Sequence, residues 1–134
     1  MGISGSWKRP AGQPRPGHRP GRYRRPYDLV TVEARRGLEA VDILRLRTAI
    51  GPVLHDCSSA TLGFLVPRGT AKGWDLPGSD CAPVEEQGER YGLFSAGGVR
   101  WLLPPHVAAP YTDPVMLRAA LGEAAVTIAA ADRL

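Results

Sequence analysis

The residues of this sequence best suited to chemistry form the run His55-Asp56-Cys57. A cysteine nucleophile needs a neighbouring base, and that base must itself be held in place. We expect the run on a strand, where successive side chains alternate between faces, so His55 and Cys57 share one face while Asp56 points away. Because nothing then orients the histidine, we assign no catalytic residues.

Two further patterns could hold a ligand. Zinc takes about four ligands, normally from closely spaced Cys or His pairs, whereas the run at 55–57 could be extended only by the distant Cys81 and His106. The Gly97-Gly98 pair lacks the following lysine and the helix of a phosphate-binding loop. We therefore expect no metal and no cofactor.

Positive charge is concentrated in residues 1–26. This segment holds seven of the 17 lysines and arginines and no acidic residue, which leaves ten basic and 13 acidic residues in 27–134. Its five prolines and five glycines are typical of a disordered arm. Arginines interleaved with aromatic residues suit phosphate contacts and base stacking, although a solubilising tail has the same composition. The candidate nucleic-acid-binding residues are Trp7, Arg9, Arg15, Arg19, Arg22, Tyr23, Arg24 and Arg25.

Residues 27–134 predict a single α/β (α+β) domain, a small sandwich of a three- to four-stranded sheet with two main helices. The second and third strands are separated by a polar turn and predict a hairpin. Residues 68–98 lack a clear period and predict a surface loop, with one helical turn at 71–76 and a weak strand at 90–94. Runs of apolar and β-branched residues predict the strands at 27–33, 53–56, 61–66 and 99–103.

Apolar residues at helical spacing predict the two helices. The first begins at Ala34 and ends near Thr48. The second begins where Asp113 can cap and Pro114 suits the first position, and it runs to the C-terminus over one face of the sheet. The expected core residues are Leu38, Ala40, Val41 and Leu44 in the first helix, and Leu117, Leu121, Ala124, Ile128 and Ala131 in the second.

The order of these segments carries a resemblance. It rests on the runs Tyr27–Glu33, Gly37–Val41, Gly51–Leu54, Thr61–Pro67 and Gly98–Pro105, which are apolar strands set around Gly and Pro landmarks. Together they resemble the N-terminal domain of bifunctional DNA primase/polymerases, of the archaeo-eukaryotic primase superfamily, in the shortened forms found in actinobacteria.

The resemblance implies a site that this sequence lacks. The family's metal-binding D-x-D pair falls on Thr31 and Glu33, and threonine cannot supply the second carboxylate that two Mg²⁺ ions require. The family's histidine is absent from 61–66, its further acid is absent from 91–94, and the upstream half of the domain is missing. Glu33 instead suits a helix start, where the dipole favours a carboxylate. We expect a primase-like scaffold without a catalytic site.

Two functions fit these observations. The first is a non-catalytic, primase-palm-like module that binds nucleic acid weakly through the arm or assists a DNA-acting partner. The second is a small protein-interaction domain with no nucleic-acid role, whose unidentified partner meets the loop around Trp74 or Trp101. Fifteen arginines against two lysines indicate GC-rich codons and a bacterial source. Apolar runs such as 61–66 are too short to span a membrane, so we expect a cytoplasmic protein without membrane contact.

Overall fold

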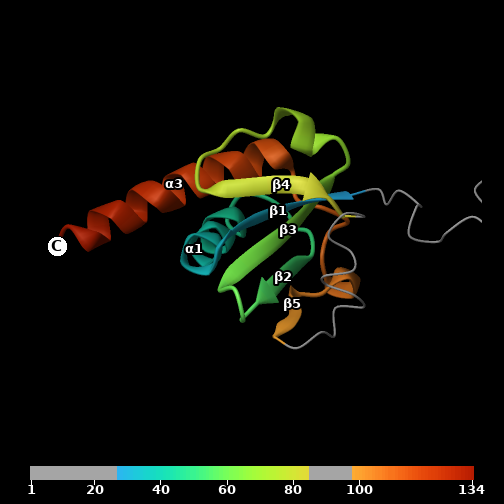
Figure 1. The fold of residues 1–134 in the computed structure, drawn as a ribbon, viewed down its shortest axis with the longest axis horizontal. Coiled ribbons are helices and arrows are strands. Elements are labelled where there is room, and N and C mark those ends of the chain that lie inside the picture. Colours follow the sequence, from blue (N-terminus) through green and yellow to red (C-terminus); the bar gives the residue numbers. More distant parts are fainter. Residues whose placement is uncertain (1–26, 85–97) are drawn as a thin grey trace, which may run out of the picture.

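The structure, a computed structural model, describes residues 27–84 and 98–134. The described chain forms one antiparallel sheet with two helices, which confirms the α+β class (Figure 1). The strands are β1 (Tyr27–Glu33), β2 (Val53–Asp56), β3 (Thr61–Pro67), β4 (Ser79–Pro83) and β5 (Val99–Leu103). The helices are α1 (Ala34–Leu44) and α3 (Pro114–Asp132), with 3-10 turns η2 (Thr70–Gly73) and η3 (Pro105–Val107).

The sheet order is β4-β1-β3-β2-β5. β3 pairs antiparallel with both β1 and β2, so β1 and β2 run parallel to each other on either side of it. With α1 connecting them, β1 and β2 form a split β-α-β motif. Strands β2 and β3 form the hairpin that the sequence predicts. The expected strand number is wrong, because the described residues alone form a sheet of five strands rather than three or four.

Strand β4 is the strand that the sequence did not predict. Its residues, Ser-Asp-Cys-Ala-Pro, have low strand propensity, and we read them as part of a surface loop. β4 lies at the sheet edge and forms because β1 offers it a complete antiparallel partner from Asp28 to Val32. The expected helical turn at 71–76 is the shorter η2, and the weak strand expected at 90–94 lies outside the described residues.

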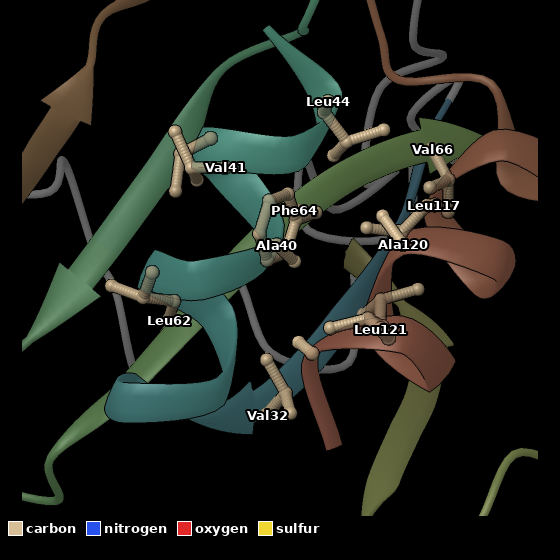
Figure 2. Close-up of a cluster of buried hydrophobic side chains, with 13 residues drawn as sticks. Val32, Ala40, Val41, Leu44, Leu62, Phe64, Val66, Leu117, Ala120 and Leu121 are labelled. Carbon is tan, nitrogen blue, oxygen red and sulfur yellow. The ribbon is translucent and has the colours of Figure 1, made fainter. Parts of the chain in front are cut away.

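The main core lies between one face of the sheet and the two helices, which pack side by side (Figure 2). Alternation along each strand sends every second side chain to this face, and α1 and α3 cover it. A smaller cluster, made of Leu29, Leu54, Leu65, Val84 and Val99, lies on the opposite face. The main core comprises Val30, Val32, Ala40, Val41, Leu44, Val53, Leu62, Phe64, Val66, Leu117, Ala120, Leu121 and Ala124.

Helix α1 differs from its prediction in two ways. Leu38 is 43% exposed, whereas its neighbour Gly37 is buried. A Cβ on Gly37 would lie 2.8 Å from the Leu62 side chain, so glycine lets α1 approach β3 closely and turns Leu38 outwards. The helix also ends at Leu44, not near Thr48, because the amides of Leu46 and Arg47 bond three residues back in a tighter final turn.

Helix α3 begins as predicted. Asp113 accepts hydrogen bonds from the amides of Val115 (2.8 Å) and Met116 (3.1 Å), and Pro114 occupies the first turn. Its later turns depart from the prediction, because Ile128 is only half-buried and Ala131 is exposed. Figure 1 shows why: α3 continues beyond the sheet. By length and composition α3 could cross a membrane, although Leu117, Ala120, Leu121 and Ala124 belong to the core.

Three hydrogen bonds hold the segment before α3 against the rest of the domain. The amide of Gly51 donates to Thr112 Oγ1 (2.9 Å), the amide of Thr112 donates to the Leu65 carbonyl (2.9 Å), and the amide of Ala109 donates to the Ile50 carbonyl (3.0 Å). Thr112 is completely buried. A Cβ on Gly51 would lie 2.4 Å from the Tyr111 backbone, so only glycine fits this crossing.

Arginines on one side of the domain tie α3 to α1. Arg36 donates from Nε to the Leu121 carbonyl (3.0 Å) and from Nη1 to the Pro77 carbonyl (2.8 Å). Arg35 pairs with Asp132 and Arg47 with Glu123, each through two hydrogen bonds. These ion pairs are exposed and contribute little individually, so the position of α3 depends chiefly on its buried side chains.

We predict that Leu121→Ala lowers the free energy of unfolding by about 2–5 kcal/mol, because it opens a cavity in the main core. Leu46→Ala is the control, since Leu46 is 85% exposed and its removal should change stability by less than about 0.5 kcal/mol. Urea denaturation measures both. Equal effects would contradict the assignment of Leu121 to the core.

We also predict that Gly51→Ala destabilises the domain by at least about 2 kcal/mol, because the new methyl group meets backbone rather than a movable side chain. Thr112→Val should cost about 1–3 kcal/mol by leaving the buried Gly51 amide without an acceptor. Gly73→Ala is the matched control, because a Cβ there meets nothing within 4 Å. If Gly51→Ala melts at the same temperature as Gly73→Ala, the crossing is not tight.

Candidate functional site

The nucleic-acid-binding residues predicted from the sequence lie outside the described residues. They belong to the segment 1–26, and their roles stay predictions. They are Trp7, Arg9, Arg15, Arg19, Arg22, Tyr23, Arg24 and Arg25.

The two positions at which the resemblance would place a metal-binding pair, Thr31 and Glu33, lie on β1, on the sheet face away from the helices. Thr31 is the register partner of Gly63 on β3 and of Asp80 on β4. Glu33 is the partner of Thr61 and is exposed. The sequence does not indicate that Asp80 lies beside Thr31, because the composition of β4 does not predict a strand. Among residues 27–84 and 98–134, no group of three His, Cys, Asp or Glu could hold a metal ion.

Glu33 stands at the start of α1, as its sequence position suggested. It occupies the N-cap position, but its side chain caps no amide of the helix. The first turn is held instead by the backbone, because the Ala34 amide donates to the Ala60 carbonyl in the β2–β3 turn (2.8 Å). The Glu33 carboxylate therefore remains a surface charge.

The run His55-Asp56-Cys57 lies at the end of β2 and in the turn that follows. His55 Nε2 is 3.9 Å from Cys57 Sγ. Asp56 Oδ1 instead accepts from Ser58 Oγ (2.6 Å), the Ser58 amide (3.1 Å) and the Ser59 amide (3.3 Å). The hydroxyl of Ser58 is the main reason that the pKa of Asp56 is lowered. Asp56 thus stabilises the turn and does not orient His55, as its strand position predicted.

The residues considered for zinc are distributed across the sheet. Cys81 lies on β4 and His55 on β2, with β1 and β3 between them. Neighbouring strands are about 4.8 Å apart, so the two backbones are separated by about 14 Å. His106 lies in η3, which follows the edge strand β5 along the chain. These residues do not converge.

A buried carboxylate on β1 has a structural role. Asp28 is 2% exposed and points to the helix side of the sheet. Its Oδ2 accepts from the amides of Gly69 (3.0 Å) and Ala71 (2.8 Å), at the start of η2. Asp28 therefore anchors the connection between β3 and β4 through these two backbone amides.

Two hollows mark the surface of the described domain. The α1–β5 groove has a volume of about 550 Å³ and is lined mainly by Leu38, Val41, Ile50, Leu102, Val107 and Ala109. The α3 groove, of about 800 Å³, is lined by Leu76, Val115, Arg118, Ala119, Gly122 and Val126, with Glu123 and Thr127 at its side. Both are shallow, largely apolar surfaces.

The tryptophans proposed as partner contacts are less available than expected. Trp74 is half-buried, packs against the main core and donates from Nε1 to Ser79 Oγ (2.8 Å). Trp101 is half-buried against the cluster on the opposite face. The largest exposed apolar side chains at the groove rims are instead Leu38, Leu102, Val107, Val115 and Val126.

Comparison with known proteins identifies no relative. No family model matches the sequence, no curated protein is significantly similar to it, and no solved structure matches the fold. The function must therefore be argued from the residues.

We predict a large difference in reactivity between the two cysteines. Burial, with help from Asp28 and Asp80, raises the pKa of Cys81 to about 12, whereas Cys57 is exposed. Because the thiolate is the nucleophile, Cys81 should resist alkylation at pH 7–9 and become reactive only as pH approaches its pKa. Mass spectrometry after iodoacetamide treatment should detect one labelled thiol per native chain and two in denaturant. Equally fast labelling of both would contradict the burial of Cys81.

Proposed function

We propose that this chain is a non-catalytic accessory module, of the primase-palm-like kind, that contacts single-stranded nucleic acid weakly through its basic arm. The observation that carries the proposal is the separation of charge along the sequence. Residues 1–26 carry seven positive charges, whereas residues 27–134 carry ten basic against 13 acidic residues. Phosphate contacts drive non-specific binding, and they require such a concentration of cations.

The charge of the sheet surface supports the assignment of binding to the arm. Single-stranded RNA is commonly bound on the open face of a small sheet, where bases stack on exposed aromatic side chains. In this domain the face away from the helices carries the exposed carboxylates of Glu33 and Asp80. Its aromatic residues, Tyr27 and Trp101, are half-buried against Leu29 and its neighbours. These charges repel a phosphate backbone.

The position of Thr31 supports a role without nucleotidyl transfer. Two-metal catalysis requires carboxylates that bridge both ions. At the two positions of the family's D-x-D pair, this chain has Thr31 and Glu33, so the pair contains a single carboxylate. Thr31 lies beside Gly63, which adds none. Asp80 adds a carboxylate across from Thr31, but on an edge strand and not within the pair. The proposal therefore assigns the domain the role of a carrier for the arm.

A second candidate, a protein-interaction domain, is favoured by the α1–β5 groove. Leu102 and Val107 are exposed at its rim together with Leu38, and β2 is the one described strand that pairs with β5. A groove between a helix and an edge strand suits an extended peptide, which adds a strand and inserts alternate side chains. If this candidate is correct, Leu38→Glu abolishes partner capture and leaves DNA binding unchanged.

We predict that affinity for a fluorescent oligo(dT) falls steeply with salt. Each phosphate neutralised on a single strand contributes a slope of about −0.7 in log affinity against log salt, so seven cations limit the slope to about −5. Replacing both Trp7 and Tyr23 by alanine should weaken binding with little change of slope, because stacking does not depend on released counterions. Fluorescence anisotropy at several salt concentrations measures both quantities.

The matched control separates the arm from the domain. Changing the six arm arginines to glutamine should weaken binding at least tenfold at low salt, whereas Arg68→Gln, Lys72→Gln and Arg100→Gln together should change affinity less than about twofold. Equal losses would move the binding site into the fold. Absence of binding by the unmodified chain at low salt would reject this function and leave the interaction domain.

A further inference from the structure

The outer side of α3 carries an apolar stripe that the described residues leave largely uncovered, with Leu76 beside it. We define the outer stripe as Val115, Ala119, Gly122, Val126 and Ala129, whose spacing alternates between four and three residues. It lies opposite the buried residues Leu117, Leu121 and Ala124, and Val115 and Val126 are 74% and 69% exposed. This spacing is that of the contact positions of a two-helix coiled coil.

No steric reason for Gly122, at the middle of the stripe, is found among residues 27–84 and 98–134. Glycine is the worst helix former after proline. Gly37 in α1 is explained by its close approach to Leu62, but a Cβ on Gly122 would meet nothing within 4 Å. A glycine in mid-helix, on an exposed apolar stripe, is explained if another helix backbone approaches there.

The charges beside the outer stripe favour a particular partner. Arg118 precedes the contact position 119, and Glu123 follows the contact position 122. In a parallel pair of helices, the residue just before a contact position of one helix lies across the interface from the residue five positions later in the other helix. Arg118 of one copy would meet Glu123 of the other, and the two-fold axis repeats the pair.

We propose that this chain forms a parallel homodimer through the outer stripe of α3, an interaction beyond the proposed binding of nucleic acid. Like residues face each other across the two-fold axis, and Gly122 lies where the helix axes are closest. Arg118 and Glu123 already have exposed partners, Asp75 and Arg47, so the interhelical pairs extend existing ion pairs into small networks.

The fold makes this association feasible for a short stripe. α3 is already held as a helix by its own core, so dimerisation does not have to order it. The α3 groove is lined mainly by apolar residues together with the charged Arg118 and Glu123, a combination that is typical of protein interfaces. The two sheets lie on the sides of the helices that face away from each other, so they do not oppose the contact.

The first test introduces a charge at the two-fold axis. In sedimentation equilibrium of the full chain at protein concentrations up to the order of 100 μM, we expect a monomer–dimer equilibrium that Gly122→Glu weakens at least tenfold. Ala131→Glu adds the same charge on the opposite, exposed side of α3 and should leave the equilibrium unchanged. Thermal melts at low concentration verify that both variants are folded. A monomeric parent chain, or equal effects of the two variants, overturns the proposal.

The second test fixes the orientation. Arg118→Glu should weaken the dimer because it places like charges across the interface, and adding Glu123→Arg should restore it. In a Cys57→Ser background, Val126→Cys should form a disulfide-linked dimer with diamide, whereas Ala131→Cys should not. Failure of the charge swap to restore the dimer, or equal cross-linking at 126 and 131, overturns the parallel arrangement.

Discussion

The domain depends on the crossing of two segments that are far apart in sequence, at Gly51 and Thr112. The Thr112 hydroxyl accepts from the Gly51 amide while its own amide donates to β3, so one buried residue links the segment after α1, the sheet and the start of α3. α3 supplies Leu117, Ala120, Leu121 and Ala124 to the core. Without this crossing, the helix that closes the core would have no fixed starting point.

Local sequence signals predicted the elements whose own residues determine their form. β1 and the β2–β3 hairpin follow from apolar runs, and the start of α3 follows from Asp113 and Pro114. β4 could not be predicted, because its pairing with β1 and not its composition makes it a strand. The exposure of Leu38 depends in the same way on the contact between Gly37 and Leu62, which only the assembled fold contains.

Some features of the candidate site likewise follow from the local sequence, whereas others depend on the assembled fold. Alternation along β1 places Thr31 and Glu33 on one face, and strand geometry separates Asp56 from His55. The carboxylate of Asp80 beside Thr31, the anchoring role of Asp28 and the two grooves arise from residues distant in sequence. A sequence therefore indicates which residues could do chemistry, whereas their neighbours across the sheet determine what chemistry remains possible.

The late position of α3 in the chain has a consequence for synthesis on the ribosome. Every strand that the structure describes is translated before α3, but the face formed by Val30, Val32, Leu62 and Phe64 is covered fully only when α3 docks beside α1. Chains fold as units while they emerge, and exposed apolar faces at that stage favour aggregation. The nascent sheet must therefore keep one apolar face uncovered until α3 has left the exit tunnel, and in that interval this face favours aggregation.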